Sequence, residues 1–260
     1  MMTEFGKQLR YWRKNKGLSQ LDLALHADVS SKHISFIETG RSKPSREMVF
    51  LLATSLDLNL RNRNDLLTAA GFSEGYNQSQ LGSEQMQEIQ QALQLILQHH
   101  APYPALAFDW HWNILMANSG FQSVMKLFQT LNPKLSSSKN IVDLTFDPNG
   151  LKPFIVNWEE VASLIVQRLH REHMENPSRH QELMQKIFSY SNIPKNWRQI
   201  DLIHNPTPTV QLTLKVEDQK LNLFTILSSF GTPIDITAEE ITIEHYFPAD
   251  DQTRAFFDDQ

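Results

Sequence analysis

Apolar residues recur every three or four positions in the first seventy residues, in short runs separated by glycine, serine and proline. This spacing predicts amphipathic helices, because residues three and four apart share one face of an α-helix. Gly17 ends the first run, Ser19 is a good N-cap for the second, and Ser30 or Ser31 can cap the third. The pattern predicts five short helices, over residues 3–16, 20–27, 31–39, 45–56 and 61–70.

The pattern changes beyond residue 72. Residues 73–83 are polar and rich in Gly, Ser and Gln, which predicts a linker, and an amphipathic helix follows over 84–99. Short apolar or alternating segments then predict strands over 105–109, 112–118, 209–216, 221–230 and 241–247. Between the second and third strands, helices are predicted over 120–131, 157–175 and 181–190, and the stretch 132–153 is expected to be irregular.

Two strands, several helices and three more strands on one antiparallel sheet predict an α+β sensor-like domain of the PAS kind. The expected fold class is therefore a two-domain chain, with an all-α domain followed by an α+β domain. The predicted division is a helical domain over 1–72, a linker and connecting helix over 73–100, and the α+β domain over 101–260. The acidic segment 248–252 is expected to be part of a solvated terminus.

Composition adds a charge asymmetry to this picture. Residues 1–72 hold eleven Lys/Arg and seven Asp/Glu, a net charge of +4, whereas the remainder holds 13 and 22, a net charge of −9. A basic module joined to an acidic body is typical of a nucleic-acid binder with a second role. The chain has no cysteine, no run of 18 apolar residues and a charged N-terminus, so we expect a soluble cytoplasmic protein without a membrane span.

The second and third predicted helices have the layout of a helix-turn-helix, with a tight turn over residues 28–30. In this motif the second helix lies in the major groove of duplex DNA and its exposed side chains contact base edges. Lys and His can donate to guanine, and an exposed Phe can contact the methyl group of thymine. Candidate base contacts are Ser31, Lys32, His33, Ser35 and Phe36, and candidate phosphate contacts are Gln20, Arg41, Lys43 and Arg46.

The segment GLSQLDLALHADVSSKHISFIETGRSKPSREM, residues 17–48, resembles the lambda-repressor-like helix-turn-helix of the XRE family of regulators. The resemblance covers roughly residues 5–60. It implies a structural ion pair between Arg13 in the first helix and Glu38 at the end of the third. Leu21 stands where the family usually has a polar residue, and Asp28 where it often has glycine.

The resemblance extends to MmyB-like regulators through PYPALAFDWHWNILMAN, NGLKPFIVNWEEVA and FGTPIDITAEEITIEHYFPADDQTR. It implies an N-terminal XRE domain and a C-terminal PAS-like domain whose ligand alters DNA affinity. The ligand type implied is a small apolar molecule, with a long-chain fatty acid as the example. We expect a homodimer on a pseudo-palindromic operator in double-stranded DNA, with the helix over 84–99 as the connection that transmits the signal.

Aromatic residues are concentrated in the C-terminal region, where they could line a cavity between the sheet and the helix over 157–175. Packed core is the competing interpretation for each of them. Trp112, Phe128, Asn118 and Arg168 are secondary candidates. The main predicted pocket residues are Phe108, Trp110, Phe121, Phe154, Asn157, Trp158, Val161, Ile165, Phe224 and Phe230.

Other function classes have weaker support in the sequence. There is no glycine-rich phosphate loop, no G-x-S-x-G segment and no cysteine nucleophile, so we expect no catalytic site and no enzyme. His170 and His173 are three residues apart but lack a third ligand at a diagnostic spacing, so no metal site or other cofactor is predicted. Two alternatives remain: a C-terminal domain that serves protein interaction or dimerisation and binds no small molecule, and an enzyme with an attached DNA anchor.

Overall fold

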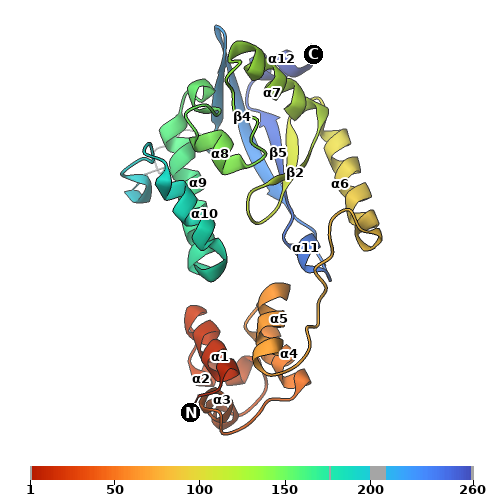
Figure 1. The fold of residues 1–260 in the computed structure, drawn as a ribbon, viewed down its shortest axis with the longest axis vertical. Helices are drawn as coiled ribbons and strands as arrows, with labels where there is room; N and C mark the ends of the chain where they lie inside the picture. Colours follow the sequence, from red (N-terminus) through yellow and green to blue (C-terminus); the bar gives the residue numbers. More distant parts are fainter. Residues whose placement is uncertain (1, 176, 200–208, 259–260) are drawn as a thin grey trace. The chain divides into compact units, whose positions relative to one another are not determined.

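The computed structural model describes residues 2–175, 177–199 and 209–258 (Figure 1). The chain forms two compact units, and each contains segments that are distant in the sequence. The N-terminal unit comprises Met1–Met86 and Phe230–Glu239, and the C-terminal unit comprises Gln87–Ser229 and Glu240–Gln260. The chain therefore passes between the units three times. The predicted division at residues 72 and 100 differs from this one.

Five helices form residues 4–69 of the N-terminal unit, as the apolar spacing predicts. Four of them begin at a side-chain cap whose oxygen accepts a backbone N–H of the first turn, and Ser19 forms a full capping box with Asp22. Asn59 caps the last helix in the same way. The helices are α1 (Glu4–Asn15), α2 (Gln20–His26), α3 (Ser31–Thr39), α4 (Arg46–Ser55) and α5 (Leu60–Ala69).

A small apolar core, together with one buried ion pair, holds α1, α2 and α3 together. The guanidinium of Arg13 donates to both carboxylate oxygens of Glu38, at 2.6 and 3.1 Å, and also to the carbonyl oxygen of Leu18 at 2.8 Å. The two charged side chains are only 8% and 3% exposed. Helices α1 and α3 approach so closely that a Cβ at Gly6 would collide with the carbonyl oxygen of Glu38.

Residues 72–79 do not behave as a free linker, although their composition predicts one. The side chain of Asn64 on α5 accepts the backbone N–H groups of Gly75 and Tyr76 and donates to the Tyr76 carbonyl oxygen. The guanidinium of Arg46 donates to the carbonyl oxygen of Ser73 at 2.8 Å. The segment is therefore hydrogen-bonded along α4 and α5.

The segment Phe230–Glu239, which connects two strands of the C-terminal unit, packs within the N-terminal unit and contains the short helix α11 (Ile236–Glu239). The carboxylate of Glu239 accepts the backbone N–H of Leu60, the first residue of α5, at 2.8 Å. Ile236 and Ala238 are buried. No signal in the sequence predicted this arrangement.

A five-stranded antiparallel sheet forms the centre of the C-terminal unit, which confirms the predicted α+β class. The strand order is β2-β1-β5-β4-β3, so the last strand in the chain lies between β1 and β4. The predicted alternation places these strands within one or a few residues of their observed bounds. The strands are β1 (Ala105–Phe108), β2 (Ile114–Ala117), β3 (Leu212–Val216), β4 (Gln219–Ser228) and β5 (Thr242–Pro248).

The helices of this unit follow the prediction in part. The expected helix over 84–99 begins with a 3-10 turn, η1 (Glu84–Met86), and continues as α6 (Gln87–His100), so a unit boundary falls inside it. The stretch 132–153, expected to be irregular, contains α8 (Ile141–Phe146) and the 3-10 turn η2 (Lys152–Phe154). The remaining helices are α7 (Ser119–Leu131), α9 (Trp158–Glu175), α10 (Pro177–Ser189) and the 3-10 turn η3 (Trp197–Gln199).

The acidic segment 248–252 connects the end of the last strand to a C-terminal helix, and its residues Asp251 and Gln252 are exposed, as expected of a solvated segment. Asp250 accepts the backbone N–H of Thr253 at 2.7 Å and thereby starts α12 (Asp251–Asp258). Its second carboxylate oxygen accepts from the side chain of Asn222 on β4 at 2.7 Å. Phe257 is buried in the core beside the sheet, so the apolar residues of this helix decide its position.

Removing one partner of the buried ion pair should destabilise the N-terminal unit far more than removing an exposed charge. Glu38→Ala leaves the guanidinium of Arg13 buried without a counter-charge, and we expect a loss of about 3–5 kcal/mol in unfolding free energy. Glu4→Ala, which breaks an exposed pair with Lys7, should cost roughly 1 kcal/mol or less. Urea unfolding followed by circular dichroism measures both variants, and equal losses would contradict the assignment.

Candidate DNA interface and ligand cavity

Helix α3 presents a polar face. Ser31 and Lys32 are exposed, while His33, Ser35 and Phe36 are half-buried. Ile34 and Ile37, on the opposite face, are fully buried in the unit's core. The five residues predicted to contact bases therefore lie on the accessible side of the helix, which is the requirement for entry into a major groove.

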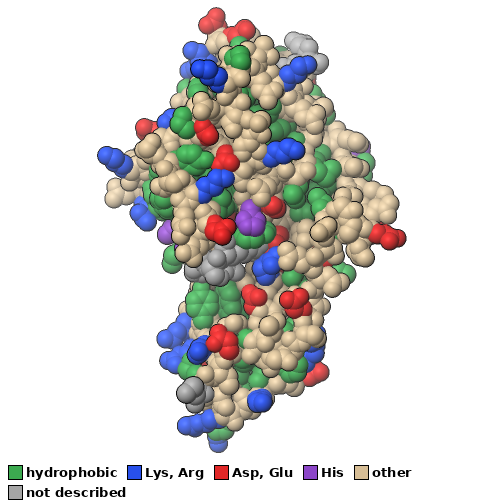
Figure 2. Space-filling view, in the orientation of Figure 1, with side chains coloured by type: hydrophobic (Ala, Val, Ile, Leu, Met, Phe, Trp, Pro, Cys, Tyr) green, Lys and Arg blue, Asp and Glu red, His purple; other side chains and the backbone are tan. Residues whose placement is uncertain are grey.

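A cationic and aromatic cluster lies at the centre of this face. The ammonium of Lys32 lies 5.5 Å from the ring centroid of Phe36, and the guanidinium carbon of Arg41 lies 5.7 Å from the same centroid. Gly40 makes this approach possible, because its φ of 77° turns the chain at the end of α3 and brings Arg41 back to Phe36. Figure 2 shows Lys and Arg side chains gathered on the part of the molecule that contains α1–α3.

Two of the predicted phosphate contacts have other partners in the structure. The amide of Gln20 donates to the carboxylate of Glu38 at 2.7 Å, so this side chain extends the buried ion pair. The guanidinium of Arg46 lies 5.4 Å from the ring centroid of Phe50 and bonds to the backbone at Ser73. The sequence predicted the same role, phosphate contact, for Gln20, Arg46, Arg41 and Lys43. In the structure Gln20 and Arg46 instead bind other groups of the protein. Arg41 and Lys43 are exposed.

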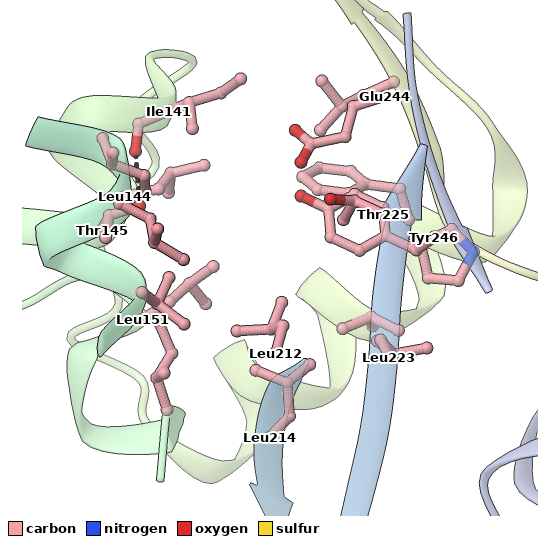
Figure 3. A pocket seen from close by; sticks show the side chains of 18 of the residues that line it. Ile141, Leu144, Thr145, Leu151, Leu212, Leu214, Leu223, Thr225, Glu244 and Tyr246 are labelled. Atoms are coloured by element: carbon pink, nitrogen blue, oxygen red, sulfur yellow. Dashed lines mark hydrogen bonds between the residues drawn. The ribbon is translucent and has the colours of Figure 1, made fainter. Parts of the chain in front are cut away.

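The C-terminal unit contains a cavity of about 280 Å³ between the sheet and the helices α7, α8 and α9. Its size lies at the lower end of small-molecule sites, and its wall is largely aliphatic and aromatic, as such sites usually are. Figure 3 shows Ile141, Leu144 and Leu151 on one side and Leu212, Leu214 and Leu223 from the strands on another.

The residues predicted to form the pocket divide into two groups. Three of the predicted positions line the cavity: Phe121, Val161 and Ile165. Of the secondary candidates, Trp112, Phe128 and Arg168 also line it, whereas Asn118 instead caps α7. The positions that lie elsewhere are Phe108, Trp110, Phe154, Asn157, Trp158, Phe224 and Phe230.

Three of the predicted pocket residues that lie outside the cavity have packing roles. Phe154 stacks behind the cavity residue Phe128, with ring centroids 4.3 Å apart. The amide of Asn157 donates to the carbonyl oxygen of Gln211 and accepts the N–H of Thr213, so it joins the start of α9 to β3. The indole of Trp158 donates to the Thr145 carbonyl oxygen at 3.0 Å. These side chains support the wall and do not face the cavity.

The other four predicted pocket residues lie outside the cavity because of strand geometry and chain topology. Phe224 lies on the sheet face opposite the cavity, where it stacks on Phe247 with centroids 5.4 Å apart. Phe108 is core beneath the guanidinium of Arg168, and Trp110 packs against His180. Phe230 belongs to the N-terminal unit.

Of the polar residues in the wall, the sequence predicted Arg168 but not those of the strands. Glu244 and Tyr246 on β5 and Thr225 on β4 face the cavity, together with Arg168 on α9 (Figure 3 labels the three strand residues). Burial raises the pKa of the Glu244 carboxyl, although the positive charge of Arg168 acts in the opposite direction. Burial and the neighbouring Glu244 raise the pKa of Tyr246. Ile243, which lies between Thr242 and Glu244 on the other face of β5, is buried as well, so the alternation in ITIEHYF does not identify the face of the cavity.

Arg168 is held in place by its own helix. Its guanidinium nitrogen Nε lies 2.9 Å from a carboxylate oxygen of Glu172, whose other oxygen accepts from the indole of Trp112 at 3.3 Å. The guanidinium also lies 4.7 Å from the ring centroid of Trp112. Among the described residues, no three His, Cys, Asp or Glu side chains gather so as to hold a metal ion. Within that same part of the chain no helix combines the length and the apolar character needed to cross a membrane.

Comparison with known proteins gives a family for each of two segments of the chain. Residues 9–61 match the helix-turn-helix family model, and residues 89–259 match the MmyB-like transcription regulator ligand binding domain. The restriction-modification controller protein C.AhdI from Aeromonas hydrophila is similar in sequence, at 34% identity over 24% of this chain and 92% of that chain, with a TM-score of 0.23. No curated protein matches the chain.

A helix-turn-helix unit joined to an α+β unit with an apolar cavity defines a DNA-binding transcription regulator with a ligand-binding domain. The family match covers more than half of the chain. The chain belongs to the MmyB-like transcription regulators.

The structure predicts that Lys43 and Arg46 contribute differently to DNA binding. Lys43 is exposed, and Lys43→Ala should reduce the slope of log affinity against log salt by about 1, because one phosphate contact is lost. Arg46→Ala should leave that slope unchanged, because the guanidinium of Arg46 is bound to the Ser73 and Glu74 backbone. Fluorescence anisotropy with duplex DNA between about 50 and 200 mM salt makes the comparison. A reduced slope for Arg46→Ala would show that this side chain turns to DNA.

Proposed function

We propose that this chain is a cytoplasmic, ligand-responsive transcription regulator that binds DNA as a homodimer and senses a small apolar molecule in its C-terminal cavity. The strand order and the helices between β2 and β3 support a PAS-like interpretation of that domain. The observation that carries the proposal is the apolar cavity within the segment that matches a ligand-binding family. The proposed role is binding, with no catalytic step.

The cavity supports a long-chain fatty acid as the ligand type. Aliphatic side chains from four strands and three helices surround the space, and polar groups are few. Burial of a methylene group from water contributes roughly 0.8 kcal/mol, so an alkyl chain of moderate length supplies most of the affinity that such a site needs. Arg168 offers a positive charge near one part of the wall.

Two copies of the helix-turn-helix unit would place two α3 helices in successive major grooves, roughly 34 Å apart along the duplex. A ligand can change DNA affinity only by the difference in its own affinity for the two arrangements of the protein. We therefore propose that the occupied and empty cavities favour different placements of the two α3 helices. The operator sequence can be obtained by selection from a random duplex library.

Filling the cavity should remove ligand binding without unfolding the domain. Val161 lies on the cavity side of α9, so Val161→Trp places a large ring in the space that an alkyl chain would occupy. We expect at least a tenfold loss of affinity for dodecanoic acid, roughly 1.4 kcal/mol or more, by isothermal titration calorimetry. Val156→Trp is the matched control, because Val156 is exposed.

Native mass spectrometry of the purified full chain tests the same proposal independently. An apolar passenger, or a mass shift on addition of dodecanoic acid, supports ligand sensing. A spectrum that stays free of ligand, together with intact DNA binding, would instead favour a C-terminal domain that serves protein interaction or dimerisation.

A further inference from the structure

Helix α1 carries a line of positive side chains that the candidate DNA interface does not include. Lys7, Arg10 and Lys14 are three and four positions apart, so they lie along one side of the helix. All three are exposed. Lys7 pairs with the exposed carboxylate of Glu4 at 3.3 Å, which is a weak interaction in water. We call Lys7, Arg10 and Lys14 the α1 ridge.

The contacts of α1 with α3 show on which side of the helix the ridge lies. A Cβ at Gly6 would collide with the carbonyl oxygen of Glu38, and the Arg13 guanidinium binds the Glu38 carboxylate. The α-helix turns by about 100° per residue. The ridge therefore lies about 60–120° from Arg13 in one direction around α1, and the buried Phe5 and Trp12 lie about 80–100° in the other.

The polar face of α3 lies on the same side of the α1–α3 contact as the ridge. Ile34 and Ile37 of α3 enter the core that Phe5 and Trp12 of α1 also fill. That core therefore lies on one side of the contact for both helices. The ridge and the polar face of α3 both lie on the side away from it, so they border each other on one surface. The Lys and Arg side chains gathered in Figure 2 lie over these helices.

A duplex that contacts the polar face of α3 presents phosphates to this surface. Lys7 and Lys14 are seven residues apart, which is about 10 Å along the helix, and one DNA strand carries roughly three phosphates over that length. Each phosphate that a Lys or Arg neutralises releases a condensed counterion, which favours binding. An acidic protein surface has the same sign of charge, but the continuity of the ridge with the face of α3 favours the duplex.

We infer that the α1 ridge is a second part of the DNA interface, which binds phosphates beside the bases that α3 contacts. This inference rests on DNA binding by the helix-turn-helix unit and enlarges the surface that takes part in it. The ridge reads no sequence, because phosphate contacts position a protein on the duplex but carry no base information.

Alanine variants test the ridge through the salt dependence of DNA binding. Lys7→Ala, Arg10→Ala and Lys14→Ala should each lower the slope of log affinity against log salt by about 0.9, and the triple variant by roughly 2–3. The loss of affinity should be equal on the selected operator duplex and on an unrelated duplex of the same length, because no base contact is removed. Fluorescence anisotropy with the full chain between about 50 and 200 mM salt measures both.

Lys16→Ala is the matched control for charge. Lys16 directly follows α1, but its ammonium donates to the carbonyl oxygen of Asp57, at the turn between α4 and α5, at 3.2 Å. This variant should keep the slope of the wild type. Circular dichroism checks that each variant is folded, and the single variants keep the test decisive where the triple variant does not fold.

Three results separate the possible failures. An unchanged slope in the folded variants, which an acidic protein partner would also produce, would overturn the inference. A loss of affinity confined to the selected duplex would overturn it as well, because the ridge would then read bases. If the wild type binds neither duplex at about 50 mM salt, the failure lies with DNA binding by the helix-turn-helix unit itself.

A different observation concerns Phe36 on α3. The ammonium of Lys32 lies 5.5 Å from the centroid of its ring, and the guanidinium carbon of Arg41 lies 5.7 Å from the same centroid. The carbonyl oxygen of Phe36 also accepts the backbone N–H groups of Arg41 and Ser42, at 2.8 and 3.2 Å. Phe36 therefore contacts both a side chain of α3 and the turn that follows this helix.

The ring offsets two costs of holding these cations in place. Lys32 and Arg41 carry like charges near one ring, so they repel each other. Their long side chains also lose rotamer entropy when they are fixed. The negative face of an aromatic ring attracts a cation, whereas an aliphatic side chain of similar apolar character does not.

The geometry points to Phe36 as a positioning residue that holds Lys32 and Arg41 for their contacts with DNA. This role differs from the contact with a thymine methyl group that the sequence predicts. Phe36 would act through two cations, and it need not touch a base itself.

Substitutions that keep or remove the aromatic face separate the two roles. Phe36→Tyr keeps the ring and should bind DNA like the wild type. Phe36→Leu can still contact a methyl group, but it should weaken binding about 2- to 5-fold for each cation released. Lys32→Ala should then cost less in the Phe36→Leu background than in the wild type, by about the same factor. Anisotropy titrations of the full chain and its variants on the selected duplex measure each affinity.

Three outcomes would contradict the positioning role. Equal affinities of Phe36→Tyr and Phe36→Leu would show that the aromatic face contributes nothing. Additive losses for Phe36→Leu and Lys32→Ala would show that the two side chains act separately. A loss in Phe36→Leu that disappears on a duplex with uracil in place of thymine would assign Phe36 to the methyl contact.

Discussion

The antiparallel pairing of β4 with β5 is the interaction on which the cavity depends. Its register pairs Thr225 with Tyr246 and Leu227 with Glu244, and this places the polar groups of two strands together on one sheet face. The same pairing brings together the two ends of the segment 230–239, which packs in the N-terminal unit. A register slip of one residue would turn Glu244 out of the cavity, because the side-chain period of a strand is two.

The N-terminal unit depends in a similar way on the carboxylate of Glu38. Arg13 and Gln20 both donate to it, so one buried charge joins α1, the start of α2 and the end of α3. A buried ion pair contributes little net stability compared with an apolar replacement, but it specifies one geometry. Here that geometry is the orientation of the helix whose free face carries Lys32 and Phe36.

Much of the fold could be predicted from local patterns. Caps and apolar spacing located α1 to α5, and alternation located the strands, because both signals act over a few neighbouring residues. Asp28, which stands where the XRE family often has glycine, also has a local explanation. Its φ of 49° is a left-handed conformation that glycine adopts freely and aspartate tolerates. Helix α8 was missed because it is short and lies among prolines and serines, where periodicity carries little information.

The sequence by itself determined the class of each unit, the face of α3 that is accessible and the apolar character of the second domain. Only the tertiary structure decided which of these side chains form a site. Arg46 turns to the Ser73 backbone, Phe224 lies on the far face of the sheet, and Glu244 points into the cavity although its strand pattern suggests solvent. The physical reason is that both faces of the sheet carry buried residues, such as Ile243 on one and Leu223 on the other, so alternation along one strand cannot tell which face holds the cavity.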